Sequence, residues 1–135
     1  MINLNCFNRV FLALFVSISV SLVASAANSE EDTLKLIQQA KYNVFTGNWD
    51  VHLDLDIKTI EQGIKNSMPG LDYTLVDEKV SSPMLSTLIF RGAGDQKVAI
   101  KLKRYEAFTN VRIRVGLTGN ESKSAQIFSY IYRKM

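Results

Sequence analysis

Residues 97–115, KVAIKLKRYEAFTNVRIRV, decide the fold of this chain of 135 residues. Two runs in this stretch alternate apolar and polar side chains, and the short segment 105–109 separates them. A period of two is typical of a strand with one buried face, and strands joined by a short turn pair antiparallel. The stretch therefore predicts a hairpin of two strands, 96–104 and 110–117. Its apolar face consists of Val98, Ile100, Leu102, Val111, Ile113 and Val115.

The same alternation predicts three more strands before this hairpin. The first follows Gly47, with Trp49, Val51, Leu53 and Leu55 on one face and Asp50, His52 and Asp54 on the other. The next two are expected at 71–80 and 85–91, with a turn at 81–83. Leu71, Tyr73 and Leu75 are expected to share one face. The loop 92–95, GAGD, lacks the Lys-Ser/Thr ending of a phosphate-binding loop and joins two strands, which favours a tight hairpin turn.

Two helices complete the predicted domain. Asp56 is a favourable N-cap for the first, and Pro69 and Gly70 end it. Its apolar stripe consists of Ile57, Ile60, Ile64 and Met68. Gly119 and Asn120 offer a turn and an N-cap for the second. The apolar face of this closing helix consists of Ala125, Ile127, Phe128, Ile131 and Tyr132.

The expected element order is β-α-β-β-β-β-α. Each strand has one apolar face, so the helices can cover one side of the sheet while the other stays in water. The predicted class is α+β, a two-layer sandwich of an antiparallel sheet with two helices on one face. The residues expected to be buried together are Trp49, Leu53, Ile60, Ile64, Leu75, Phe90, Ile100, Ile113, Val115, Ile127 and Ile131.

Residues 1–26 are typical of a cleavable export signal. Arg9 and the amino terminus supply positive charge, residues 10–24 are uncharged, and Ala24-Ser25-Ala26 forms a small-residue cleavage site. The alternative is an uncleaved anchor, but a spanning helix needs about 20 apolar residues and this run is shorter. We expect a periplasmic protein that begins near Ala27. Cys6 is the single cysteine of the chain and leaves with the signal, so no disulfide is expected.

Residues 27–41 are expected to form a linker or a short helix ahead of an α+β domain at 42–135. Ser29 and Asp32 bracket a sequence that resembles a capping box, with acidic residues in the first turn. Leu34, Ile37 and Ala40 then follow at helical spacing, which is a weak apolar stripe.

The run VRIRVGLTGNE at 111–121, with Ser124 and Ile127 after it, resembles a family of small uncharacterised envelope proteins of Gram-negative bacteria. In that family a "G-K-K-V-T-I-K-L" strand precedes "T-x-I-R-V-G-x-x-G-D-x-x-x-S". A weaker match runs from Tyr42 through the helix capped by Asp56, so the resemblance covers most of the mature chain. Many relatives have a lipid-modified cysteine after the signal, which this chain lacks. The resemblance implies a fold and a location, and no activity.

A basic stripe is the strongest functional lead. The lysines and arginines alternate with the apolar residues of 97–115, so they are expected on the outward face of two neighbouring strands. The stripe consists of Lys97, Lys101, Lys103, Arg112 and Arg114, and Arg104 and Arg133 are expected to extend it. Such a surface attracts lipid headgroups, lipopolysaccharide phosphates or an acidic envelope protein. The alternative is an ordinary solvated face, partly neutralised by Asp50 and Asp54.

Enzymatic chemistry is not indicated. His52 is the only histidine, and the mature chain has neither a cysteine nor a G-x-S-x-G nucleophile elbow. Asp50, His52 and Asp54 share a strand face, but a metal ion would need a further ligand from another strand. We therefore expect no cofactor and no metal. A formal net charge of +3 on an exported protein does not point to nucleic acid.

These observations predict an exported, non-catalytic envelope protein that acts as a binding or adaptor module through the basic face of its sheet. The alternative is a small periplasmic hydrolase or metal-binding protein centred on His52. Substitution of His52 separates the two hypotheses, because only the alternative needs that imidazole. The sequence leaves the oligomeric state open.

Overall fold

The computed structural model describes residues 30–135, so the predicted signal at 1–26 lies outside the described residues. The chain divides into two units, Met1–Leu34 and Lys35–Met135, and the second contains the sheet. Within the described part of the chain, none of the helices has the length and apolar character needed to cross a membrane.

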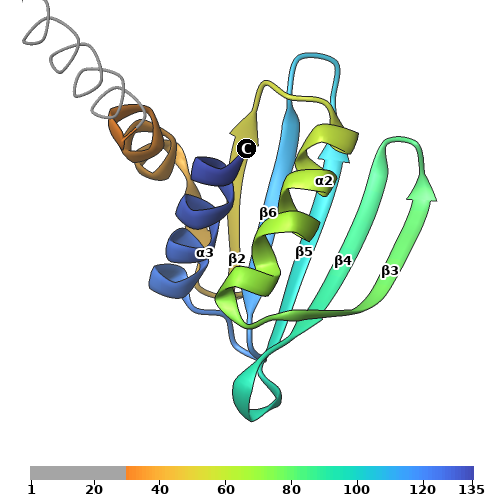
Figure 1. Cartoon of the computed structure of the whole chain (residues 1–135). Helices are drawn as coiled ribbons and strands as arrows, with labels where there is room; N and C mark the ends of the chain where they lie inside the picture. Colours follow the sequence, from red (N-terminus) through yellow and green to blue (C-terminus); the bar gives the residue numbers. More distant parts are fainter. Residues whose placement is uncertain (1–29) are drawn as a thin grey trace, which may run out of the picture. The chain divides into compact units, whose positions relative to one another are not determined.

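The described residues contain one six-stranded antiparallel sheet with the strand order β1-β2-β6-β5-β4-β3 (Figure 1). The α+β class and the sandwich of a sheet and helices are therefore confirmed. The strands are β1 (Lys41–Asn43), β2 (Asn48–Leu53), β3 (Thr74–Ser82), β4 (Leu85–Arg91), β5 (Lys97–Arg104) and β6 (Thr109–Val115). Besides the helical residues 30–39, the helices are α2 (Ile57–Ser67) and α3 (Glu121–Lys134), with short 3-10 turns η1 (Met68–Leu71) and η2 (Ala93–Asp95).

The core lies between the sheet and the two helices. The helix α2 packs on β5, α3 packs on β2 and β6, and the helices contact each other. Every residue expected in the core is buried except Leu75. At the centre, Ile100 pairs with Ile113 across β5 and β6, and both side chains are fully buried. The hairpin predicted from 97–115 and the facing of its side chains are thus confirmed, and the structure adds the register between the two strands.

Placing Leu75 in the core was wrong. The strand β3 begins at Thr74, after η1 and a left-handed Asp72 with φ 62°, so Leu71 belongs to the turn. All nine residues of β3 are exposed, and the Leu75 side chain is 37% exposed. The physical reason is position, since β3 is the sheet edge beyond the strands that α2 and α3 cover (Figure 1).

The segment expected to be a linker, residues 27–41, contributes to the fold where the structure describes it. Residues 30–39 are helical, and Leu36, Ile37 and Ala40 pack against the core of the second unit. The strand β1 pairs antiparallel with β2, with Tyr42 opposite Trp49. Three residues are too few for a period of two to be recognised, which is why this edge strand was not predicted.

The two predicted N-caps behave differently. The side chain of Asn120 accepts a hydrogen bond from the backbone N–H of Lys123 at 2.9 Å, which caps α3. Asp56 occupies the N-cap position of α2, but its carboxylate accepts from the hydroxyl of Thr59 and makes no backbone cap. That hydroxyl lowers the pKa of Asp56 from its ordinary value.

Two glycines hold the turn before β2 against the turn before α3. Gly47 and Gly119 have φ values of +71° and +82°, which L side chains rarely adopt. A Cβ atom at Gly47 would collide with the backbone of Thr118 and Gly119, and one at Gly119 would collide with the backbone of Gly47. The two turns therefore touch backbone to backbone.

Candidate binding face

The outer face of the sheet, opposite the helices, carries the predicted basic stripe. Lys97, Lys101 and Lys103 alternate along β5 with buried apolar residues, and Arg112 and Arg114 do so along β6. Lys101 lies directly opposite Arg112. The fold therefore brings together all five residues that the sequence singled out, because β5 and β6 are neighbours and share their polar face.

One cross-strand row runs through the middle of this face. We call it the central row, and it consists of Lys41, Asp50, Arg112, Lys101, Thr87 and Lys79, each opposite the next on β1, β2, β6, β5, β4 and β3. Residues opposite each other in an antiparallel pair lie on the same side of the sheet. The row therefore places one carboxylate among four cations.

Asp50 neutralises Arg112. The Arg112 Nε atom lies 2.8 Å from Asp50 Oδ1, and its Nη2 atom lies 3.3 Å from Oδ2. The side-chain amide of Asn110 also donates to Asp50 Oδ1, at 3.0 Å. Arg112 thus makes a two-pronged contact, which fixes its orientation better than a single hydrogen bond does. Both oxygens of the Asp50 carboxylate therefore accept hydrogen bonds from Arg112 or Asn110.

The remaining four cations of the stripe have no carboxylate partner within residues 30–135. The side chains of Lys97 and Lys101 make no hydrogen bond or ion pair there, and Lys101 lies opposite Arg112 on β6. The Lys103 Nζ atom lies 5.1 Å from the ring centroid of Tyr105, and Arg114 donates to the backbone carbonyl of Leu117. Like charges directly opposite each other destabilise a sheet. This face therefore carries surplus positive charge that an anion would relieve.

Arg104 and Arg133 do not extend the stripe, contrary to expectation. The side chain of Arg104 is half-buried, and its Nη1 atom donates to the Leu55 carbonyl at 3.0 Å and to Thr109 Oγ1 at 3.2 Å. The alternation of β5 explains this, because residue 104 has the parity of the buried Leu102. Arg133 lies on α3, which covers the other face of the sheet.

Sequence reasoning missed an aromatic stack at one end of the stripe. The ring of Phe108 lies between the rings of His52 and Tyr105, with centroid distances of 4.1 Å and 4.9 Å. Lys103 sits over Tyr105 at the end of this stack. The sequence predicts only a connection at 105–109, and this prediction assigns Tyr105 and Phe108 to neither face of the sheet. The pairing of His52 with Asn110 on β6 explains their approach.

The geometry around His52 bears on the alternative hypothesis. His52 is exposed and stacks on Phe108, while Asp50 on the same strand is bound to Arg112 and Asn110. Among residues 30–135, no three histidine, cysteine, aspartate or glutamate side chains lie close enough to hold a metal ion.

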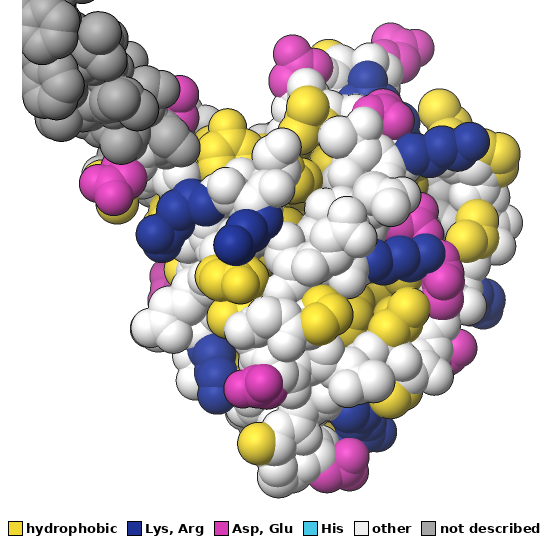
Figure 2. Space-filling view, viewed as in Figure 1, with side chains coloured by type: hydrophobic (Ala, Val, Ile, Leu, Met, Phe, Trp, Pro, Cys, Tyr) yellow, Lys and Arg dark blue, Asp and Glu magenta, His cyan; other side chains and the backbone are white. Residues whose placement is uncertain are grey.

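The helix side of the molecule has a different character. There lysine and arginine side chains are scattered among hydrophobic and uncharged ones (Figure 2). A shallow depression of about 530 Å³ lies where α2 ends, and a second of about 440 Å³ lies between α2 and the end of the chain. The first is lined by Lys65, Pro69, Asp72, Tyr73, Thr74, Leu75 and Phe90.

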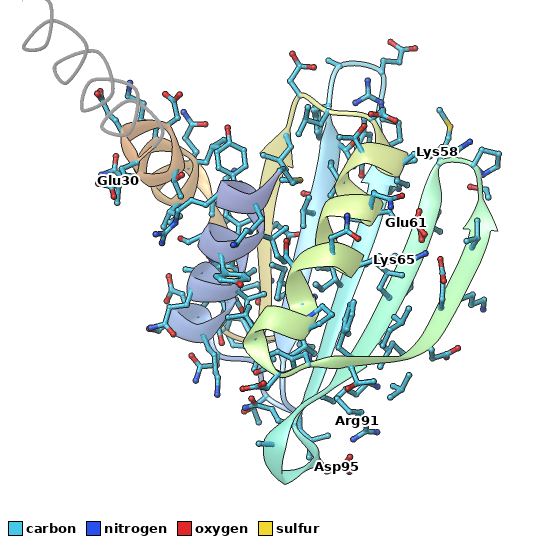
Figure 3. All side chains as sticks on the ribbon, in the orientation of Figure 1. Glu30, Lys58, Glu61, Lys65, Arg91 and Asp95 are labelled. Atoms are coloured by element: carbon cyan, nitrogen blue, oxygen red, sulfur yellow. The ribbon has the colours of Figure 1, made fainter. Side chains whose placement is uncertain are left out.

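One charged cluster on the helix side links α2 to the edge strand. Lys65 and Glu61 project from α2, and the Lys65 Nζ atom lies 2.7 Å from Glu78 Oε1 on β3 and 3.3 Å from Glu61 Oε1 (Figure 3). The bond to Lys65 lowers the pKa of Glu78, and the bond to Glu78 raises the pKa of Lys65. Partial burial, followed by the nearby Glu78, raises the pKa of Glu61.

The fold and this face define a small α+β protein with a basic, open sheet surface. The chain belongs to a family described as a protein of unknown function, DUF3568, whose model matches residues 9–134. This confirms the resemblance at the level of an uncharacterised family. A comparison with curated proteins found none that matches the chain.

Proposed function

We propose that this protein is an exported, non-catalytic component of a Gram-negative cell envelope that binds anionic surfaces through the outer face of its sheet. The observation that carries the proposal is the surplus of cations on that face. Lys97, Lys101, Lys103 and Arg114 have no carboxylate partner within the described residues, although the neighbouring Arg112 is neutralised by Asp50.

The chemistry favours phosphate-rich ligands such as lipid headgroups or lipopolysaccharide. Each lysine or arginine near an anionic membrane surface contributes about 1 kcal/mol. The cations project from adjacent strands of a rigid sheet, so they can engage an extended surface together without ordering a loop. A deep pocket is not needed for such a contact, which suits the open shape of this face.

The proposed envelope location is supported by the predicted export signal at residues 1–26. Residues 10–24 are uncharged and end in a small-residue cleavage site, which is the pattern of a removed export signal. We expect the exported chain to begin at Ala27, and an intact-mass measurement of protein recovered from the periplasm tests this. A mass that retains residues 1–26 would indicate an anchor instead.

The test of the binding face is sedimentation with anionic vesicles at a series of salt concentrations. The variant Lys97→Glu/Lys103→Glu reverses two charges that have no carboxylate partner in the described residues, and neither residue lies opposite Arg112. We expect binding at least about 30-fold weaker, since two contributions of about 1 kcal/mol each are lost. Wild-type binding should also fall steeply with salt, because exposed charges are screened over about 8 Å at physiological ionic strength.

The matched control is Lys58→Glu/Lys123→Glu. It changes the net charge by the same amount, but both residues lie on the helices that cover the other face. We expect the control to bind vesicles nearly as well as the wild type. Equal loss in both variants would mean that net charge alone drives binding. No binding by the wild type even at low salt would contradict the proposal.

A further inference from the structure

The strand β3 presents a long, open edge. It pairs with β4 on one side, is the last strand in the sheet order, and is exposed along all nine residues. An edge strand offers unpaired N–H and C=O groups, which makes it a template for another strand. Natural edges are usually protected by charges and bulges, so the charges of β3 decide which partner it accepts.

The sequence of β3, TLVDEKVSS, is complementary to itself when reversed. About Glu78 as the centre, Asp77 mirrors Lys79 and Val76 mirrors Val80. Opposite charges and apolar residues placed across from each other stabilise an antiparallel pair. A second copy of the same strand therefore places Asp77 opposite Lys79 twice, whereas Val76 lies in a bulge of β3 and does not contribute.

We infer that two copies of this chain associate through antiparallel pairing of their β3 strands about a two-fold axis at Glu78. Asp77 of each copy then lies opposite Lys79 of the other. The six strands of each copy join into one continuous sheet. Such an interface is isologous and closes on itself, so it yields a dimer rather than a fibre.

The charges select one register. A two-fold axis that makes neighbouring strands antiparallel is perpendicular to the sheet, so facing residues must point to the same side. Pairings shifted by one residue break this rule. A shift of two residues places Lys79 opposite Lys79, or Asp77 opposite Asp77, which is repulsive. Only the register centred on Glu78 places opposite charges across from each other.

The central pair of Glu78 residues would repel if their charges were free. In each copy, however, Lys65 from α2 lies 2.7 Å from the Glu78 carboxylate and holds it toward its own helix. The bulges of β3 lie between Leu75 and Asp77, at Val76, and between Val80 and Ser82, so the regular segment runs from Asp77 to Val80 and contains the three charged residues. The paired segment is short, and we expect weak dimerisation that depends on concentration.

Charge reversal tests the inference in solution, without vesicles, so its outcome is independent of the proposed function. By sedimentation equilibrium of the purified protein, Lys79→Asp alone and Asp77→Lys alone should each raise the dimer dissociation constant about tenfold or more, because each places like charges in opposition. The double variant Asp77→Lys/Lys79→Asp restores the opposition of unlike charges and should recover the wild-type constant. Thermal melts confirm that each variant is folded.

A cysteine cross-link tests the register. Residues opposite each other in an antiparallel pair have Cα atoms about 4.5–5.5 Å apart, within the range that a disulfide spans. In a Cys6→Ser background, Glu78→Cys should therefore cross-link to its counterpart under mild oxidation. The matched control is Ser81→Cys, which is also exposed but lies about 20 Å from its own counterpart in this register. We expect it to cross-link at least tenfold more slowly.

Three outcomes would overturn the inference. The first is a monomer at every concentration tested, as expected if the edge instead receives an extended segment of a different protein. The second is a dimer that is indifferent to the single reversals. The third is equal cross-linking of both cysteine variants.

Discussion

The two hairpins β5–β6 and β3–β4 have the same antiparallel connectivity and different surroundings. Along β5 and β6, every second residue except Arg104 is buried beneath the helices, and both strands have neighbours on each edge. Along β3, no residue is buried, although Leu75, Val76 and Val80 are apolar. A period of two indicates which side chains share a face. Whether that face is covered depends on where the strand lies in the sheet.

The largest expected effect comes from a substitution in the hairpin β5–β6, which the helices cover. Ile113→Ala removes a side chain that is 0% exposed and packs at the centre of β6, and should cost about 2–5 kcal/mol of unfolding free energy. The matched variant on the edge strand β3, Leu75→Ala, should cost about 1 kcal/mol or less, because the Leu75 side chain is already 37% exposed and the change leaves no closed cavity. Denaturant melts measure both values, and equal losses would mean that β3 is covered in solution.

An intermediate effect is expected at the glycine contact. Gly119→Ala is strained by a φ of +82° and also forces a methyl group into the backbone of Gly47, so we expect a loss of about 1–3 kcal/mol. Gly116→Ala is the control, because Gly116 has a φ of +73° but no atom near its missing Cβ. The difference in melting between the two variants reports the contact between the turns. Identical losses of stability in the two variants would mean that backbone strain alone explains the effect and that the contact with Gly47 contributes nothing.

The smallest expected effect concerns the charged cluster of Glu61, Lys65 and Glu78, which links α2 to the edge strand β3. The pKa of Glu78 is lowered by Lys65, so its contribution to stability is present above the ordinary glutamate pKa and is lost as the pH falls through the folded value. Glu78→Gln should therefore lower the melting temperature slightly at pH 7 and leave it unchanged at pH 3. The raised pKa of Glu61 acts in the opposite direction and reduces the net effect. A larger deficit at acidic pH would contradict this assignment.

The sequence was sufficient for elements whose pattern is local. Alternation places Ile100, Lys101, Ile113 and Arg112 on their correct faces, and Asn120 is recognisable as a cap from its neighbours. Arg104 has the same parity as the buried Leu102, so the alternation of β5 alone places it on the inner face. The stack of His52 with Phe108 and the pairing of Arg112 with Asp50 depend on β2 joining β6. Strand order is a property of the whole sheet and cannot be obtained from any one segment.

The pairing of β2 with β6 has a consequence for how the chain folds. From β3 to β6 each strand pairs with the next in sequence, whereas Asp50 and Arg112 are 62 positions apart. Contacts between distant segments form slowly, because the intervening chain must lose entropy first. We expect a four-stranded meander to form early and β2 to dock last. The single tryptophan, Trp49, lies on β2 with its ring 5.2 Å from that of Phe128 on α3. Its fluorescence should therefore change in the slow phase of refolding, after most of the circular dichroism signal has returned.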